Sequence, residues 1–315
     1  MSFASPTVSF ALSAIRVPNL RARNKSLKNS GFYSGSVSCQ QKAFAENVLQ
    51  NKAPFSSVGP KLVRQLAMSS PGSLRVHQTK EDLVSSLSEE IKSAIAAGPA
   101  IPGNSREKIA VAVSGGSLPG LLKAAVARDL RSFANLDKAL WIMVDERAVP
   151  RNHPESNYRA VSEALSGVVP PDQILGVPEE ALSESTDSIA LKYEQLLRSK
   201  GISPSDIALA LLGMGEDGHT ASLFPRTWAS AVDVSGTRFY VGVDDSPKAP
   251  PRRITLTLSA INAAHKRVFV VTGRNKATAV NHIFQEGNSQ RLPAGLVQNA
   301  IWLVDEEAVS GLKKD

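Results

Sequence analysis

Residues 208–212 constrain the fold more than any other stretch, because ALALL offers five consecutive apolar side chains and no polar face. A strand of this composition needs cover on both faces, as strands receive in a parallel sheet between helices. Further strands are predicted at residues 109–113, 139–144, 266–272 and 300–304, with helix-like segments between them. This alternation predicts an α/β fold in which a mostly parallel sheet carries helices on both faces.

The segments between these strands have the apolar spacing of helices. In residues 80–97 the apolar side chains recur at the interval of one helix face. Other helices are predicted at residues 119–130, 186–200 and 276–285 and after the RNHPES loop, and other strands at residues 74–78, 239–243 and 253–258. Because no internal repeat or second core interrupts this pattern, we predict one domain over residues 69–315.

Residues 1–68, here called the leader, differ in composition from the rest of the chain. They contain nine Lys and Arg residues and a single acid, Glu46. A segment rich in serine and arginine and poor in acids is typical of an organellar transit peptide. No arginine precedes Arg16, which favours a plastid over a mitochondrion. The alternative interpretation is an ordinary disordered tail.

The composition of residues 69–315 argues against several classes of protein. The whole chain carries +7, and without the basic leader the remainder is close to −1, so nothing indicates a nucleic-acid partner. The single cysteine, Cys39, lies in the leader, which leaves the remainder without disulfide or thiolate chemistry. No apolar stretch approaches the roughly 18 residues of a membrane span.

The loop that follows residues 208–212 is rich in glycine and ends in an acid and a histidine. Gly213, Gly215 and Gly218 spell GxGxxG, the pattern of a dinucleotide site, but Pro225 cuts short the long helix that such a site requires. A second interpretation makes His219 a catalytic base, because histidine exchanges protons near neutral pH. In a third, His219 lies at a helix start and bonds a neighbouring backbone group.

Other candidate binding groups follow other predicted strands. The turn of Ser114, Gly115, Gly116 and Ser117 joins a strand to a helix start, where backbone N–H groups bind anions such as phosphate; a tight connection alone is the alternative. Arg253 begins a strand and Lys276 begins a helix. If all strands are parallel, Arg253 and Lys276 face the same sheet edge and together can clamp a phosphate. The alternative is that each is a solvated surface charge.

Asp145 and Arg147 follow the strand at residues 139–144, either as part of this site or as a structural ion pair. The five histidines show neither HExxH nor another metal-ligand spacing, and no GxSxG supports a serine nucleophile.

Five blocks together resemble the 6-phosphogluconolactonase family, in its plant plastid form: VAVSGGSLPGLL, VDERAVPRNHPESNY, LLGMGEDGHTASLFP, PPRRITLTLSAIN and VTGRNKATAV. The resemblance spans residues 74–309, and its DER and GMGEDGHTASLFP blocks are specific. It implies a single-domain modified Rossmann-like fold, shared with glucosamine-6-phosphate deaminases and with relatives of ribose-5-phosphate isomerase.

The resemblance also implies a reaction, the hydrolysis of 6-phospho-D-glucono-1,5-lactone in the oxidative pentose phosphate pathway, without metal or cofactor. His219 would be the general base and Asp145 would support it. The implied substrate-binding residues are Ser114, Gly115, Gly116, Ser117, Arg147, Gly215, Arg253 and Lys276. The expected partner is a small sugar phosphate lactone, and the expected state is a monomer in the plastid stroma.

Two rival functions remain on this fold. The amino-sugar phosphate deaminase/isomerases resemble the chain at the SGG turn, the HPES segment and the GxDGH loop. Their pattern, however, has Tyr after the Asp-Glu pair and an acid before the proline that closes the His loop, where this chain has Arg147 and Phe224. A non-catalytic sugar-phosphate sensor is the other rival, although His219 and Asp145 are both intact.

Overall fold

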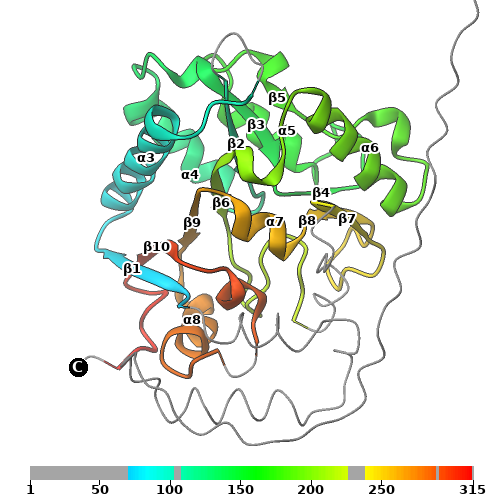
Figure 1. Cartoon of the computed structure of the whole chain (residues 1–315). Helices are drawn as coiled ribbons and strands as arrows, with labels where there is room; N and C mark the ends of the chain where they lie inside the picture. Colours follow the sequence, from blue (N-terminus) through cyan, green and yellow to red (C-terminus); the bar gives the residue numbers. More distant parts are fainter. Residues whose placement is uncertain (1–69, 103–107, 226–237, 289–290, 314–315) are drawn as a thin grey trace, which may run out of the picture. The chain divides into compact units, whose positions relative to one another are not determined.

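The computed structural model describes residues 70–102, 108–225, 238–288 and 291–313 (Figure 1). The predicted transit peptide and Cys39 lie outside these ranges. In chain order the strands and α-helices are β1 (Gly72–His77), α3 (Lys80–Ala97), β2 (Ile109–Val113), α4 (Leu118–Ala125), β3 (Ala139–Met143), β4 (Asp145–Arg147), α5 (Asn157–Ala164), β5 (Ile174–Leu175), α6 (Thr186–Ser199), β6 (Ile207–Leu212), β7 (Tyr240–Val243), β8 (Arg253–Leu256), α7 (Leu258–Ala263), β9 (Lys266–Val271), α8 (Ala277–Phe284) and β10 (Ala300–Asp305).

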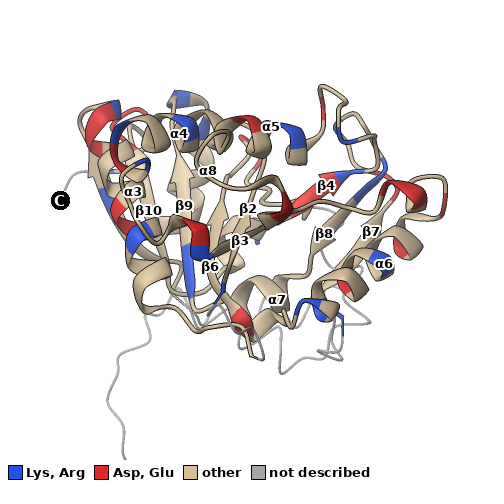
Figure 2. Ribbon diagram, turned by 90° about the horizontal axis from the view of Figure 1, so that it is seen from above, with Lys and Arg blue, Asp and Glu red and all other residues tan. Residues whose placement is uncertain are grey.

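A seven-stranded sheet in the order β1-β10-β9-β6-β2-β3-β5 forms the centre of the fold, and every neighbouring pair in it is parallel. Figure 2 shows α3, α4 and α5 on one side of its strands and α6 and α7 on the other. The predicted fold class is therefore confirmed. Strand β6, the ALALL run, lies in the middle of the order and is buried along its whole length.

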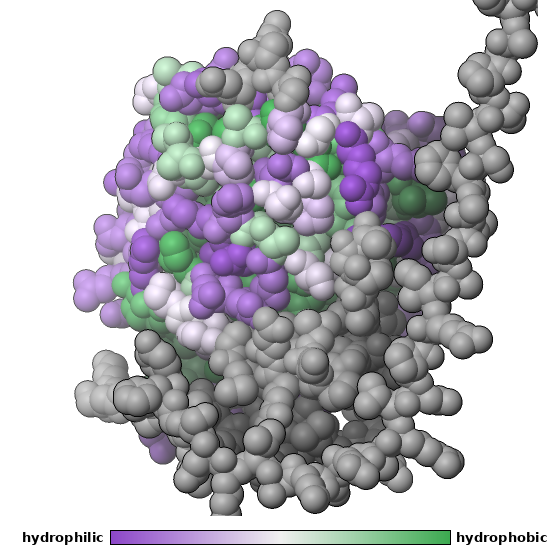
Figure 3. Space-filling model, viewed as in Figure 1, coloured by the Kyte–Doolittle hydropathy of each residue, from purple (hydrophilic) through white to green (hydrophobic). Residues whose placement is uncertain are grey.

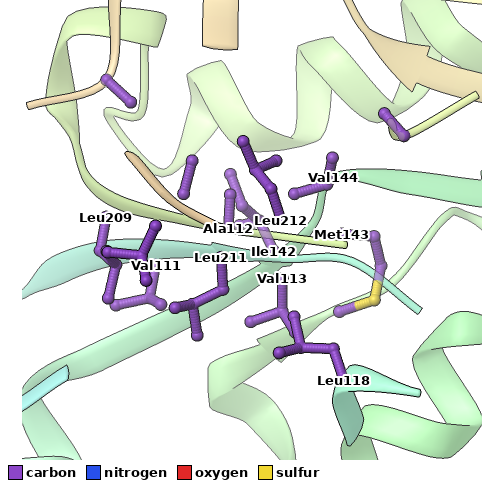
Figure 4. Packing of buried hydrophobic residues seen from close by; sticks show 14 of the residues in the cluster. Val111, Ala112, Val113, Leu118, Ile142, Met143, Val144, Leu209, Leu211 and Leu212 are labelled. Carbon is purple, nitrogen blue, oxygen red and sulfur yellow. The ribbon is translucent and has the colours of Figure 1, made fainter. Parts of the chain in front are cut away.

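The core lies between the central strands and the helices that cover them. Side chains of β2, β3 and β6, among them Val111, Ile142 and Leu211, pack together with Leu118 at the start of α4 (Figure 4). All three strands are buried throughout. Each large apolar side chain buried in this way contributes about 1.5–3 kcal/mol to stability, which keeps the strand ends in fixed positions.

A second, three-stranded sheet in the order β4-β8-β7 is antiparallel and was not predicted. The two sheets meet at Val144, between β3 and β4. Its N–H donates to Val113 O in β2, and its carbonyl accepts from Leu256 N in β8. A single extended segment thus passes from one sheet to the other and leaves Asp145 at the junction.

This second sheet corrects the prediction for residues 239–258. The strands expected at residues 239–243 and 253–258 do not join the parallel sheet, so the argument that placed Arg253 on its edge was wrong. The second of them ends early, because the Thr257 side chain accepts the Ala260 N–H and caps α7. Short β4, β5 and α7 were also missed, since periodicity over so few residues carries little signal.

The surface shown in Figure 3 mixes polar and apolar residues, with green patches scattered among purple ones. Among the described residues, the large apolar side chains that stay exposed are Val76 in the edge strand β1 and Leu191 in α6. Within the same ranges, no helix combines the length and the apolar character that crossing a membrane requires.

Candidate active site

A pocket of about 490 Å³ lies where the loops after β2, β3, β6 and β9 meet the second sheet. In a parallel sheet these loops all leave from the carboxyl ends of the strands, which is where such folds bind ligands. The lining residues are Ser114, Gly115, Gly116, Ser117, Asp145, Arg147, Asn157, Gly213, Met214, Gly215, His219, Ala221, Lys248, Ala249, Arg253, Thr272, Asn275 and Lys276.

His219 lies in the loop after β6 and is paired with Asp217. Its ring Nδ1 is 2.5 Å from Asp217 Oδ1, and its side chain is 16% exposed. An ionised carboxylate only accepts hydrogen bonds, so Nδ1 carries the proton in this pair, and in a neutral imidazole the lone pair then belongs to Nε2. Burial acts to raise the pKa of Asp217, but the hydrogen bonds and charge of His219 outweigh it and lower that pKa to about 2.

The loop that carries this pair is held by its own backbone. Gly215 N donates to His219 O at 2.8 Å, Gly218 N donates to Gly215 O, and the Thr220 hydroxyl donates to Gly213 O. A Cβ at position 215 would lie 2.0 Å from His219 Nδ1, so only glycine fits beside the ring. Among residues 219–225 there is no helix, so the interpretation of His219 as a helix-start residue is wrong.

Asp145 is buried at the junction of the two sheets, where its carboxylate is fixed by neighbours other than His219. Ser222 Oγ donates to its Oδ2 at 2.7 Å, and Asn157 Nδ2 lies 3.4 Å from its Oδ1. Ser222 belongs to the same loop as His219, so Asp145 is tied to that loop indirectly. The acid that contacts the His219 ring is Asp217, which the sequence-based site omitted.

The turn after β2 presents polar groups without protein partners. Within the part of the chain that the structure describes, the buried Ser114 Oγ has no hydrogen-bond partner, and Ser117, the N-cap of α4, makes no side-chain capping bond. The first N–H groups of α4 have no partners within the helix and carry the positive end of its dipole. These groups make the turn suitable for binding an anion.

The cations of the pocket fall into two groups by their charged neighbours. Arg147 and Arg253 face each other across β4 and β8, and the charges acting on Arg253 are Asp145, Arg147 and Glu155. The charged groups that act on Lys276 are Glu216, Lys248 and Asp217. Burial lowers the pKa of Lys276.

Several donors of these cations are free. Among the described residues, the ammonium groups of Lys248 and Lys276 have no hydrogen-bond or ion-pair partner, and neither has the buried Arg147 Nε, although Arg147 Nη1 contacts Glu155. Burial lowers the pKa of Arg253, whose guanidinium donates to the carbonyls of Pro250, Lys248 and Ala249. Arg253 is buried and donates to carbonyls, with no carboxylate partner among the described residues, and Lys248 and Lys276 add positive charge beside it, so this arrangement favours an anionic ligand.

All ten residues that the sequence suggested for the site line this one pocket. The sequence argument placed Arg253 at the edge of the parallel sheet, but Arg253 reaches the pocket from β8 of the antiparallel sheet. Asp217, Asn157, Lys248 and Asn275 were missed. Asp217 was detectable from its spacing of two before His219, and Asn157 from the HPESNY block, whereas nothing in the sequence distinguishes Lys248 or Asn275 from surface residues.

Among the described residues, no three His, Cys, Asp or Glu side chains gather so as to hold a metal ion.

Comparison with known proteins gives relatives along most of the chain. The human 6-phosphogluconolactonase is 32% identical over 252 residues, which are 77% of this chain and 95% of the human protein. The probable 6-phosphogluconolactonase 1 of Arabidopsis thaliana is 34% identical over 263 residues, 77% of this chain and 94% of that protein. A probable chloroplastic 6-phosphogluconolactonase 3 of Oryza sativa subsp. indica is 34% identical over 222 residues, 66% of this chain and 67% of that protein.

Solved structures agree in fold. The 6-phosphogluconolactonase of Trypanosoma brucei superimposes with a TM-score of 0.64 at 24% identity, covering 77% of this chain and 99% of that one. Residues 78–304 match the family described as glucosamine-6-phosphate isomerases/6-phosphogluconolactonase. With this match over most of its length and relatives above 30% identity, the chain belongs to the glucosamine-6-phosphate isomerase/6-phosphogluconolactonase family.

Proposed function

We propose that this protein hydrolyses 6-phospho-D-glucono-1,5-lactone to 6-phospho-D-gluconate, the reaction for which its relatives in man and Mycobacterium tuberculosis are named. The observation that carries the proposal is the His219–Asp217 pair at the edge of a pocket lined by four cations, Arg147, Lys248, Arg253 and Lys276. A base beside an anion site suits a neutral, hydrolysable ring that carries a phosphate.

In this mechanism His219 Nε2 takes a proton from a water molecule, whose oxygen attacks the lactone carbonyl carbon. The bond from that carbon to the ring oxygen then breaks, and the proton passes to the leaving oxygen, which becomes a hydroxyl. Asp217 keeps the proton on Nδ1 and stabilises the imidazolium that forms. The acid product loses its own proton to water.

The remaining pocket groups bind the substrate and balance its charge. The Ser114–Ser117 turn and Lys276 hold the phosphate, and Arg147 and Arg253 lie near the developing negative charge and the sugar hydroxyls. Binding the phosphate away from the reacting carbon fixes the carbonyl in front of His219. Asp145, fixed by Ser222, supports the sugar end.

The contacts of Phe224 argue against the deaminase/isomerase function. Its ring centroid lies 4.6 Å from that of His219, and the Arg253 guanidinium lies 5.7 Å above the Phe224 ring. The residue that is an acid in the deaminase pattern is here an apolar side chain against the base. The second proton carrier that isomerisation requires is therefore absent at this position.

The test is lactone hydrolysis by the full chain, with the lactone generated in situ from glucose 6-phosphate. We expect acceleration over the spontaneous rate, which EDTA leaves unchanged and which His219→Ala abolishes. His265→Ala is the matched control, because that histidine bonds the Ser205 carbonyl outside the pocket. A folded wild-type protein that binds 6-phosphogluconate without accelerating hydrolysis would instead establish the sensor.

We also propose that residues 1–68 direct the protein to the plastid, supported by their acid-poor composition and by the chloroplastic relative from rice. A fluorescent protein fused after residue 68 should enter isolated chloroplasts and be shortened there. Import into mitochondria instead would overturn the plastid assignment.

A further inference from the structure

Glu146 is a buried acid that lies outside the pocket, between two residues that line it. It occupies the middle of β4, next to Asp145 and Arg147, and is 3% exposed. Its Oε1 accepts the N–H groups of Arg147 and Asn157, both at 2.8 Å. Its Oε2 accepts the Tyr158 N–H at 2.7 Å and the Ser156 hydroxyl at 3.1 Å. Both oxygens are thus fully used within the protein.

Three of these donors belong to the start of α5. Ser156 is the N-cap, and Asn157 and Tyr158 are the first helical residues, whose N–H groups have no acceptor within the helix. The Glu146 carboxyl oxygens satisfy those N–H groups and face the positive end of the helix dipole. Glu146 therefore fastens the start of α5 to β4 through these hydrogen bonds.

Asn157, the helical residue that Glu146 holds by its backbone, reaches the pocket with its side chain. Its Nδ2 donates to Asp145 O at 2.7 Å, and its Oδ1 packs against Gly115, where a Cβ would lie only 1.9 Å away. Asn157 is 3% exposed, so both contacts are buried. The amide thus lies between Asp145 and the turn that follows β2, two parts of the site that come from different strands.

We propose that Glu146 is a positioning residue for the reaction: it holds Asn157, and through Asn157 it keeps Asp145 and the Gly115 turn at a fixed separation across the pocket. Glu146 itself does not touch the substrate. This inference rests on the proposed lactonase function. The groups held in this way belong to the turn after β2, to β4 and to α5, so a small shift of the start of α5 changes the spacing of groups that must act on one substrate.

The test compares four proteins at pH 8: wild type, Glu146→Gln, Asn157→Ala and the double variant. Glutamine keeps the shape of Glu146 but replaces one acceptor oxygen by an NH2 group, so either Arg147 N and Asn157 N or Tyr158 N and Ser156 Oγ lose their acceptor. We expect kcat to fall roughly tenfold in Glu146→Gln while KM stays within about twofold. If Glu146 acts through Asn157, the double variant should be little slower than the slower single variant.

Glu163→Gln is the matched control, because that acid lies on the exposed face of the same helix and pairs only with Arg159. It should leave kcat unchanged. Circular dichroism and 6-phosphogluconate binding by calorimetry check that each variant is folded. If Glu146→Gln does not fold, Ser156→Gly takes its place in the cycle with Asn157→Ala; it removes one donor to Glu146 together with the cap on Arg159 N, and glycine is the substitution that costs an N-cap least.

Three results would overturn the inference: an unchanged kcat in Glu146→Gln, effects of Glu146→Gln and Asn157→Ala that multiply as for independent sites, or a loss in KM alone. In all three cases the wild-type protein still hydrolyses the lactone. The absence of hydrolysis by the wild-type protein would instead defeat the proposed function, so the two failures can be told apart.

Discussion

Asp217 decides what His219 can do, because it contacts the ring nitrogen that faces away from the proposed reaction. The pair depends on a two-residue spacing inside a tight loop, which brings Asp217 Oδ1 within 2.5 Å of Nδ1. A loop of this kind defines both the tautomer and the direction of the imidazole. Asp145, the acid that the sequence argument favoured, contacts Ser222 and Asn157 instead.

Replacing Asp217 by Asn should therefore lower kcat by roughly 10²-fold with little effect on KM, because an amide cannot stabilise the imidazolium by charge. Steady-state kinetics with the lactone measure this. Glu216→Gln is the control for kcat, since it removes an exposed acid from the same loop that, among the described residues, has no hydrogen bond or ion pair with His219. Because Glu216 acts on Lys276, the KM of this variant is not used in the comparison. Equal losses in both variants would contradict a specific role for Asp217.

Glu146 should make stability depend on pH. Burial, opposed by the N–H groups of Tyr158, Asn157 and Arg147, raises its pKa from 4.5 to about 7. Between these values the unfolded chain has released a proton that the folded protein still holds, so raising the pH favours unfolding. The free energy of unfolding should fall by on the order of 3 kcal/mol over this window from Glu146 alone.

Urea denaturation of wild type and Glu146→Gln at pH values from 4.5 to 8 measures this contribution. The difference between the two proteins should change across the window, with wild type losing more stability as the pH rises. Two curves that run parallel throughout would show that Glu146 has an ordinary pKa in the folded protein.

At the scale of elements, the chain passes directly from β3 in the parallel sheet to β4 in the antiparallel sheet, and this places the pocket between the two sheets. Strand β5 pairs with only Trp141 and Ile142 of β3, so Met143 lacks a strand partner on that side. The hydroxyl groups of two buried tyrosines bond the Met143 backbone in place of a neighbouring strand. Tyr193 OH accepts the Met143 N–H at 3.0 Å and donates to Leu175 O, and Tyr240 OH donates to Met143 O at 2.5 Å.

Tyr240→Phe should lower the free energy of unfolding by about 1–3 kcal/mol, because it leaves the buried Met143 carbonyl without this donor. Chemical denaturation measures the loss. Tyr158→Phe is the matched control, since the Tyr158 hydroxyl has no hydrogen-bond partner within the described residues and its ring keeps the contact with Arg151. A loss of the same size in the control would show that the hydrogen bond is not the cause.

At the scale of the whole molecule, the pocket concentrates positive charge on a chain whose residues 69–315 carry a net charge close to −1. Arg147, Arg253, Lys248 and Lys276 line it, against one acid, Asp145. The field that attracts a sugar phosphate is therefore local to the site and does not come from net charge. Salt screens such a field more effectively before binding than after the ligand has excluded water.

Raising the NaCl concentration from about 0.05 M to about 0.5 M should raise KM severalfold and change kcat little, because ions screen the approach of the phosphate. Inorganic phosphate should compete with the substrate. In Lys276→Ala, KM should be higher at low salt and less sensitive to salt, whereas Lys123→Ala, outside the pocket, should behave as wild type. A KM independent of salt would contradict electrostatic recognition.

The sequence by itself determined the parallel sheet, because uniformly apolar runs such as ALALL can be buried only between two layers of helices. It also indicated the strand-end residues of the pocket, since parallel strands direct their carboxyl ends to one edge. These are local or periodic properties, and composition and spacing record them directly.

Only the tertiary structure decided the rest. The antiparallel sheet that brings Arg253 to the pocket depends on β4, β8 and β7 pairing over distances that no local pattern reports. The choice of Asp217 over Asp145 as the partner of His219 depends on the turn geometry of one loop, and the presence of Lys248 in the pocket depends on where its loop lies. Side-chain proximity between distant segments is set by packing, and packing is a property of the whole fold.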